Sequence, residues 1–201
     1  MRRAVSGRDV GWGYAIVVLV VQLVLAVLPS QIHDRVVLDS STNLANLHQY
    51  PPLVLGASAF VVDSPWDLWL LPLLVAAYGA VQRWLGRTAT LIMGVLSHVG
   101  ATVFVATMLT ARISRGEASL TVATSADVGV SYGIAGLLGL LAARVPRRWR
   151  YAYLGVISAT LVAALLASRT FTNLGHLTAW ALGLAVAWIA AKAQRMASTA
   201  R

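Results

Sequence analysis

Six apolar segments, separated by short polar or arginine-rich connections, constrain the fold of this chain more than any other feature. They cover roughly residues 12–28, 66–81, 89–110, 128–143, 151–167 and 174–191. A helix that spans a bilayer needs about 20 mainly apolar residues, so several of these segments are short for a full span. The composition, 58% hydrophobic and only 11% charged, also departs from that of soluble domains. We therefore predict an all-α membrane protein with a six-helix bundle in residues 12–191.

The basic residues predict the orientation of this bundle. If the N-terminus lies in the cytoplasm, twelve of the 16 basic residues fall on the cytoplasmic side and four on the outer side. The N-terminal residues 1–11 and the basic tail, residues 192–201, are therefore both expected in the cytoplasm. The net charge of +9 is thus explained as a topology signal. No basic face interleaved with aromatic residues indicates nucleic-acid binding.

Two further segments need an interpretation. The first apolar segment follows a basic start, so it is either a cleaved signal peptide or a retained anchor. Its length and the Pro29-Ser30-Gln31 flank favour the anchor. The predicted outer loop, residues 29–65, contains "LVLGASAFVV", which is too short to span but suits a segment in the membrane interface. The chain has no cysteine, which excludes disulfides and thiolate metal sites, and we expect no metal or cofactor.

The fourth apolar segment contains "DVGVSYGIAGLLG" (127–139), with the spacing Gly-x-Ser-x-Gly around Ser131. In soluble hydrolases this spacing marks a nucleophilic serine, but there a β-strand precedes it, and none is expected here. The alternative is a small residue in a packed membrane helix. That alternative is supported by the small residues around the serine, namely Gly129, Gly133, Gly136 and Gly139. Polar residues lead into this short segment, which would place Ser131 at the floor of a water-accessible cavity.

His176, near the predicted outer start of the last segment, favours chemistry over packing. Ionisable residues in membrane segments are costly and generally face a cavity or a partner. Small residues continue both helical faces, namely Ala135 and Gly139 after Ser131, and Ala179, Gly183 and Ala187 after His176. Such faces allow two helices to approach closely, with Ser131 and His176 at similar depth. A serine becomes a nucleophile when a base lies within hydrogen-bond reach.

These stretches together resemble the rhomboid intramembrane serine proteases. "GVSYGIAGLLG" is similar to the Gly-x-Ser stretch on that family's fourth helix, and "HLTAWALG" to the histidine stretch at the start of the sixth. "AYGAVQRWLG" and "LVLGASAFV" resemble the end of the second helix and the segment ahead of it. The resemblance covers roughly residues 50–190. It implies a six-helix fold in which Ser131 is the nucleophile and His176 the base, acting on a transmembrane protein substrate without a cofactor.

The chain also departs from the family pattern. The family usually has His-x-x-x-Asn on its second helix to stabilise the oxyanion, and alignment on Gly79 places Asp67 and Leu71 there. Leucine donates no hydrogen bond, and an ionised Asp67 would repel the developing negative charge. Ala135 stands where an aromatic residue usually packs against the histidine, and Tyr132 or Trp180 is a substitute for it. The alternative function is therefore a proteolytically inactive rhomboid-like protein that binds transmembrane client helices.

The remaining candidates support the proposed pair. The oxyanion would rest on the backbone N–H of Ser131, next to Gly129, helped by His98 or by a protonated Asp67. A membrane histidine such as His98 more often bonds a backbone carbonyl or lines a cavity. Asp127 either orients His176, as the acid of a triad does, or caps the fourth helix, which is the commoner role.

Five small residues are expected at helix contacts: Gly133, Gly136, Gly139, Ala179 and Gly183. The bias toward Ala, Val and Arg, with a single lysine, suggests a bacterium with a GC-rich genome. The expected location is therefore the bacterial plasma membrane.

Overall fold

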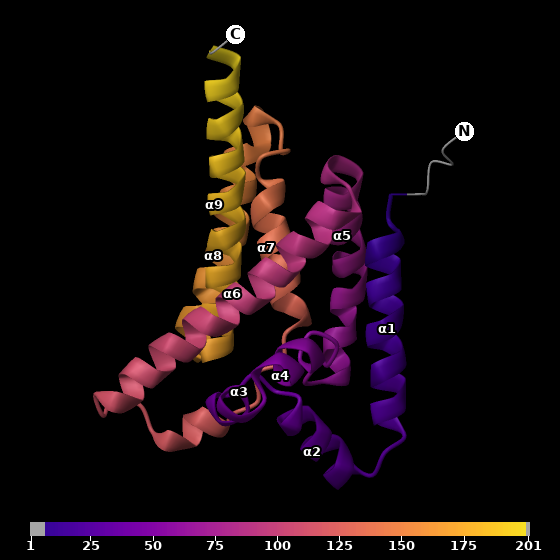
Figure 1. The fold of residues 1–201 in the computed structure, drawn as a ribbon, viewed down its shortest axis with the longest axis vertical. Helices are drawn as coiled ribbons and strands as arrows, with labels where there is room; N and C mark the ends of the chain where they lie inside the picture. The colour runs from indigo at the N-terminus through magenta and orange to yellow at the C-terminus, as the bar shows by residue number, and fades with distance from the viewer. Residues whose placement is uncertain (1–6, 200–201) are drawn as a thin grey trace.

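The computed structural model describes residues 7–199, and their regular structure is entirely helical (Figure 1). The α-helices are α1 (Asp9–Ala26), α2 (Ser30–Asp39), α3 (Leu44–Gln49), α4 (Pro51–Ala57), α5 (Leu70–Leu85), α6 (Arg87–Ser114), α7 (Val130–Leu141), α8 (Arg147–Ser168) and α9 (Phe171–Thr199), and the 3₁₀ helices are η1 (Pro65–Trp69) and η2 (Leu120–Thr124). The predicted terminal segments, 1–11 and 192–201, lie partly outside the described residues.

Each of the six predicted apolar segments overlaps one of the longer helices, with ends that differ by up to several residues. Five helical stretches are long and apolar enough to cross a bilayer, namely Asp9–Ala26, Trp66–Leu85, Arg87–Ser114, Arg147–Ser168 and Phe171–Lys192. The sixth, α7, is apolar but has only 12 residues. The chain therefore has the helices of a multi-pass membrane protein, and the count of six spans stays a prediction that depends on α7.

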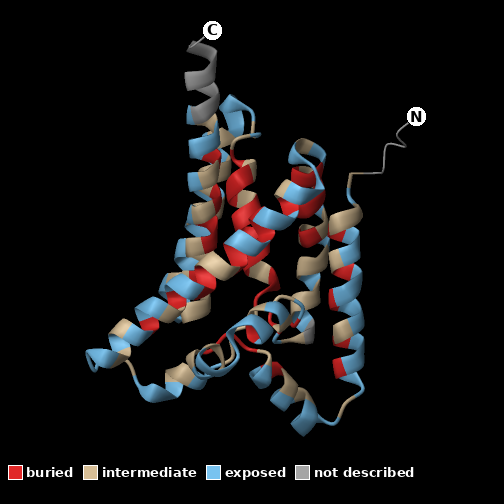
Figure 2. Ribbon diagram, in the orientation of Figure 1, coloured by how far each residue is buried: buried red, intermediate tan, exposed pale blue. Residues whose placement is uncertain are grey.

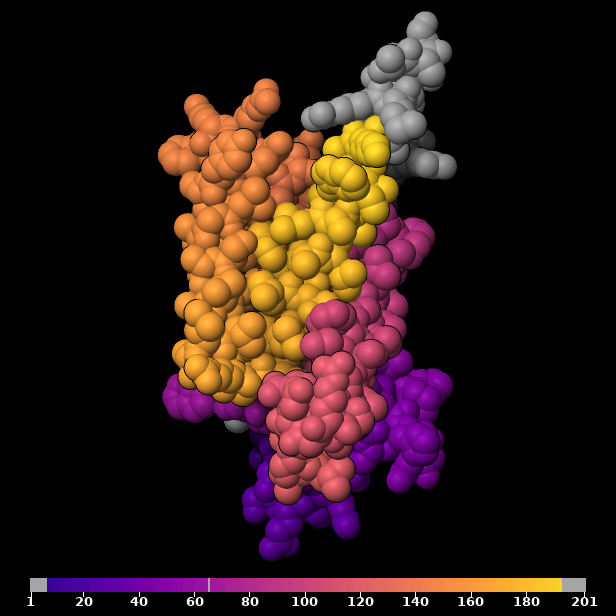
Figure 3. All heavy atoms as spheres, turned by 90° about the vertical axis from the view of Figure 1, so that its left-hand side faces the viewer, coloured from indigo at the N-terminus to yellow at the C-terminus, as the bar shows by residue number. Residues whose placement is uncertain are grey.

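The short helix α7 lies at the centre of the bundle. Nine of its twelve residues are buried, and Figure 2 shows buried residues concentrated there. Helices α5, α6 and α9 pack against it, and α6 crosses it obliquely in Figure 1. Helix α8 lies beside α9 on the face shown in Figure 3, and none of its residues is buried. The core is thus built around the helix that carries Ser131.

Glycines permit the close crossing of α7 and α9. A Cβ atom added at Gly183 would lie 2.0 Å from the backbone oxygen of Gly136, and one added at Gly139 would lie 2.4 Å from that of Trp180. Ala179 is fully buried at the same contact. Gly133 instead faces α5, where an added Cβ would meet the Tyr78 hydroxyl at 2.5 Å. Four of the five small residues predicted for helix packing therefore lie at the α7–α9 crossing, and the fifth lies between α5 and α7.

The long loop after α1 forms the three short helices α2, α3 and α4. The apolar run predicted to lie in the membrane interface falls on α4 and the turn that follows it. Val54 of α4 is buried, and the Ser58 carbonyl accepts a hydrogen bond from the backbone N–H of Gly129 at 2.8 Å. This loop is therefore fastened to the chain just before α7.

Helix α1 begins and α9 ends at the same end of the bundle, away from α2, α3 and α4 (Figure 1). This arrangement is compatible with two chain ends on one side of a membrane. That this side is the cytoplasm stays a prediction.

Candidate functional site

Ser131 and His176 meet where α7 and α9 begin. Ser131 lies in the first turn of α7 and His176 in the second turn of α9, and both are half-buried. The Ser131 Oγ and the His176 Nε2 are 2.7 Å apart. This is the distance of a good hydrogen bond between a hydroxyl and an imidazole. The close α7–α9 crossing therefore brings together the two residues that the sequence predicted as a nucleophile and its base.

The pair faces a cavity of about 520 Å³. Its walls come from η1, α5, α7, α8, α9 and the loop before α7. Among the lining residues are Ser131, His176, Asp67, Asp127, Leu73 and Leu161. A mostly apolar cavity with a few converging polar groups is the usual form of a binding or active site.

Asp127, which lines this cavity, forms hydrogen bonds with three separate parts of the chain. Its carboxylate accepts hydrogen bonds from the Tyr132 hydroxyl at 2.8 and 3.0 Å and from the Thr172 hydroxyl at 3.1 Å. Thr42, in the connection between α2 and α3, donates to its backbone oxygen at 3.0 Å. Because Tyr132 lies on α7 and Thr172 on α9, the Asp127 carboxylate holds the starts of these two helices at a fixed distance.

The prediction that Asp127 caps the fourth helix is wrong. The N-cap residue of α7 is Gly129, which has no side chain to bond the first turn. The Asp127 carboxylate instead accepts hydrogen bonds from the Tyr132 hydroxyl of α7 and the Thr172 hydroxyl of α9. Burial raises the pKa of the Asp127 carboxyl above its usual 3.8, and the hydroxyl donors offset part of that rise.

Tyr132 fills the place next to His176. Its ring packs edge-on against the imidazole, with centroids 5.2 Å apart and an interplanar angle of 76°. The ring is completely buried, and a Cβ added at Gly175 would lie 2.3 Å from it. Of the two aromatic residues predicted as substitutes, Tyr132 contacts the histidine, while Trp180 packs at a tilt against Tyr153 of α8 and donates to the Ser158 hydroxyl.

The groups predicted to stabilise the oxyanion do not all lie beside Ser131. The first N–H groups of a helix have no partner within the helix, and Ser131 contributes one of those of α7. The N–H of Gly129 is already bonded to Ser58. Asp67 lines the cavity, where its carboxylate also accepts a hydrogen bond from the Ser64 N–H at 3.3 Å. Leu71 lines a different groove, between α5 and α1.

His98 lies outside the cavity of Ser131. Its Nε2 is 3.1 Å from both the Leu55 backbone oxygen and the Ser58 hydroxyl. Its ring also occupies the space beside Gly129, where an added Cβ would be 2.5 Å away. The structure therefore places His98 as a link between α6 and the C-terminal end of α4, in the carbonyl-bonding position that the sequence offered as the alternative.

Three residues that help to form this site were not predicted from the sequence. Thr172 lies one helical turn before His176, Gly175 directly precedes it, and Thr42 lies in the distant loop. In the stretch "TNLGH" (172–176), Thr172 is one helical turn from His176 and Gly175 is its neighbour, so both could have been found from the sequence. No local pattern indicates Thr42. Within residues 7–199, no group of three or more His, Asp or Glu side chains is arranged to hold a metal ion.

A comparison with known families decides the classification. The family described as rhomboid-like protein matches residues 5–196, which is nearly the whole chain. The chain belongs to the rhomboid-like family. No curated protein and no solved structure matched it. The resemblance inferred from the serine and histidine stretches is thereby confirmed at the level of the family, and the rhomboid-like chain is a multi-pass membrane protein.

Proposed function

We propose that this rhomboid-like protein is an intramembrane serine protease that cleaves transmembrane protein substrates with Ser131 and His176. The observation that carries the proposal is the 2.7 Å approach of the Ser131 Oγ to the His176 Nε2 at the wall of a cavity. Both side chains are half-buried, so a substrate carbonyl and water have access to them. Family membership supports the same assignment.

The reaction is an acyl transfer in two halves. The Ser131 Oγ attacks the substrate carbonyl carbon while its proton passes to a neutral His176 Nε2. Collapse of the tetrahedral intermediate breaks the C–N bond, and His176 gives the proton to the leaving amine. A water molecule from the cavity then attacks the acyl-enzyme, again with His176 as base, and releases the new carboxylate and the free Ser131 hydroxyl.

The start of α7 supplies the electrostatic support. The Ser131 N–H lies in the first turn, where N–H groups lack helical partners and the helix dipole favours negative charge. An oxyanion formed at Ser131 therefore meets a donor that is already oriented. The Asp127 carboxylate acts indirectly, because its hydrogen bonds hold Tyr132 against the His176 imidazole.

The cavity indicates how a substrate helix reaches the serine. Leu70 and Leu73 of α5 line one side, and Ile157 and Leu161 of α8 line the other. Because no residue of α8 is buried, α8 is the α-helix of this wall that is held least tightly by packing. We propose that the substrate enters between α5 and α8 from the lipid.

The alternative is an inactive rhomboid-like protein that binds transmembrane helices. It is favoured by Asp67, which lines the cavity, and by Leu71, which lies in another groove. No amide or imidazole of α5 therefore lines the cavity. Under the protease proposal, Asp67→Asn removes a charge that opposes the oxyanion and accelerates acylation about fivefold to tenfold. An inactive binding protein shows no such gain.

The experiment is proteolysis in a bilayer. The purified protein is reconstituted in liposomes with a pool of single-span transmembrane peptides, and the products are identified by mass spectrometry. We expect cuts within or beside the apolar segments, which Ser131→Ala and His176→Ala abolish and the exposed-site control Ser168→Ala retains. Peptides that bind the wild type and stay intact would support the inactive alternative.

A further inference from the structure

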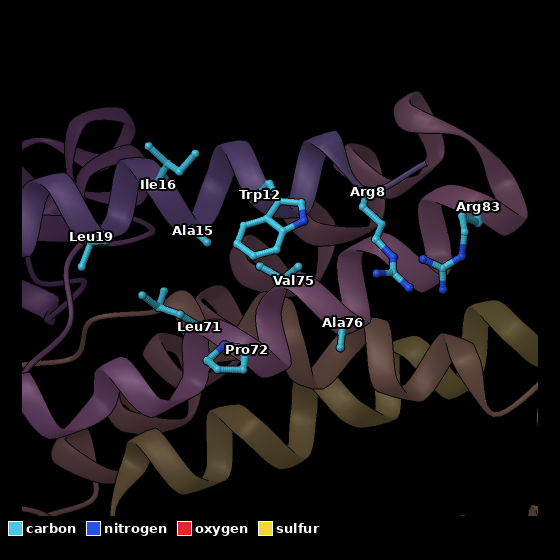
Figure 4. Close-up of a pocket in the computed structure, with 10 residues that line it drawn as sticks. All are labelled: Arg8, Trp12, Ala15, Ile16, Leu19, Leu71, Pro72, Val75, Ala76 and Arg83. Carbon is cyan, nitrogen blue, oxygen red and sulfur yellow. The ribbon is translucent and has the colours of Figure 1, made fainter. Parts of the chain in front are cut away.

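A second cavity, of about 510 Å³, lies between α1 and α5 and shares no lining residue with the cavity of Ser131 (Figure 4). On α1 it is lined along one helical face that runs from Arg8 past Ile16 to Leu19. On α5 it is lined from Leu71 and Pro72 to Arg83. The two helices run in opposite directions, so both arginines lie at one end and the apolar side chains fill the rest. None of these residues takes part in the proposed reaction.

The two arginines are held close together. Gly79 of α5 has no side chain, and a Cβ placed there would lie 2.9 Å from the Arg8 Cγ and 3.5 Å from an Arg83 guanidinium nitrogen. Figure 4 shows both guanidinium groups at the same end of the groove. The two guanidinium groups carry like charges, and an anion bound between them would offset their mutual repulsion.

No acidic residue of the chain supplies that anion. All seven Asp and Glu residues lie within the described part of the chain, and none forms an ion pair with Arg8 or Arg83. The nearest in sequence, Asp9, is bonded to Arg87 and to the Gln82 amide. The pair therefore offers a positive site to an external anion, in a position where both side chains are exposed.

The length of the apolar part identifies the kind of anion. At about 1.5 Å per residue, the stretch from Arg8 to Leu19 is about 16 Å long. This is about half of the roughly 30 Å hydrocarbon core, which is the depth of one leaflet. Trp12, 56% exposed, lies in the groove near the charged end, where tryptophan is typical of the membrane–water interface.

We infer that this groove binds one anionic phospholipid, with its phosphate on Arg8 and Arg83 and an acyl chain along α1 and α5. Guanidinium groups form charge-assisted hydrogen bonds with phosphate oxygens, and basic pockets between membrane helices suit anionic headgroups. A lipid bound in this groove contacts both α1 and α5, so it stabilises the packing of α1 on the bundle. The inference does not depend on the proposed protease activity.

The test compares lipid retention by native mass spectrometry. The full-length protein is released from nanodiscs of phosphatidylcholine mixed with phosphatidylglycerol. We expect preferential retention of one phosphatidylglycerol molecule and a loss of about 30-fold in its affinity in the variant Arg8→Gln/Arg83→Gln. The control Arg147→Gln/Arg148→Gln removes two exposed arginines at the same end of the bundle and is expected to retain the lipid.

A second variant tests the apolar half without a change in charge. Ala76 is exposed and lines the groove, so Ala76→Phe fills it and is expected to weaken phosphatidylglycerol retention. Free glycerol 3-phosphate is added in a separate arm as a competitor. Equal retention of the two lipids, equal loss in both double variants, or full displacement by glycerol 3-phosphate would each overturn the inference.

Discussion

At the scale of single residues, Tyr132 links the half-buried Asp127 carboxyl to the histidine of the pair. Its hydroxyl donates to both oxygens of Asp127, and the edge of its ring lies against His176. The sequence predicted an aromatic substitute beside the histidine, because Ala135 is too small for that place. It did not predict the link to Asp127, because that link depends on the path of the irregular segment 126–129 ahead of α7.

The first prediction concerns the Tyr132 hydroxyl. Tyr132→Phe keeps the ring beside His176 but leaves the half-buried Asp127 carboxyl short of one donor, so we expect a loss of about 1–3 kcal/mol of stability. Thermal unfolding in detergent measures this loss. The matched control is Tyr153→Phe, which removes a hydroxyl bonded to the Leu138 carbonyl at 2.7 Å, away from the site.

The same two variants separate positioning from stability. We expect Tyr132→Phe to slow the reaction of Ser131 with a fluorophosphonate, because the imidazole loses a fixed neighbour. Tyr153→Phe is expected to leave that rate unchanged in protein that remains folded. Equal rates for both variants would mean that Tyr132 is a packing residue only.

A second prediction at this scale concerns pH. Because the pKa of Asp127 is raised in the folded protein, its protonated form is favoured there. This contribution to stability is fully present below about pH 3.8, the pKa of the free carboxyl, and is lost as the pH rises through the raised pKa.

Asp127→Asn, which cannot titrate, is the reference for this effect. As the pH falls from about 7 to about 4, the melting temperature of the wild type is expected to rise relative to that of Asp127→Asn. A relative fall over the same interval would contradict the raised pKa.

At the scale of elements, the apolar pattern predicted where the long helices lie and failed mainly at their ends. Hydropathy does not mark the start of α7 at Val130, because the apolar run begins earlier, at Val128. The N-cap Gly129 is required there by the close approach of His98. The α7–α9 crossing was predictable because its glycines recur at helical spacing. The fold of residues 29–65 into three short helices was not predictable, since the contacts that hold this loop are made with distant segments such as the one before α7.

The third prediction tests the crossing. Gly183→Ala places a Cβ where the Gly136 backbone oxygen lies 2.0 Å away, and backbone cannot easily move aside. We expect a loss of about 1–3 kcal/mol or more, seen as a lower melting temperature. Gly155→Ala on α8 has open space at the same atom and is expected to be neutral or to stabilise by up to about 1 kcal/mol. Similar losses in both variants would contradict the crossing.

At the scale of the whole molecule, the Ser131–His176 site is assembled from three separate stretches of sequence, at Thr42, residues 127–132 and residues 172–176. Ser131 and His176 could be paired by their helical faces, because both helices carry small residues at matching positions. Asp127, Thr172 and Thr42 could not be assembled in advance, since hydroxyl–carboxylate contacts leave no periodic pattern in the sequence. The charge asymmetry predicts orientation, and the common end of α1 and α9 is compatible with it.

The fourth prediction tests that orientation. The chain has no cysteine, so single cysteines can be introduced without background. In intact cells a membrane-impermeant maleimide is expected to label Glu117→Cys, after α6, and to spare Arg148→Cys, at the start of α8, until the cells are opened. The reverse pattern would contradict the predicted cytoplasmic termini.

The most direct test of the central claim is the reactivity of Ser131 itself. Purified protein is treated with a fluorescent fluorophosphonate, and the modified residue is identified by mass spectrometry beside Ser131→Ala and His176→Ala. The account predicts a single adduct on Ser131 that forms in the wild type and is lost in both variants. A folded wild type that does not react, or that reacts equally without His176, would contradict a working Ser131–His176 pair.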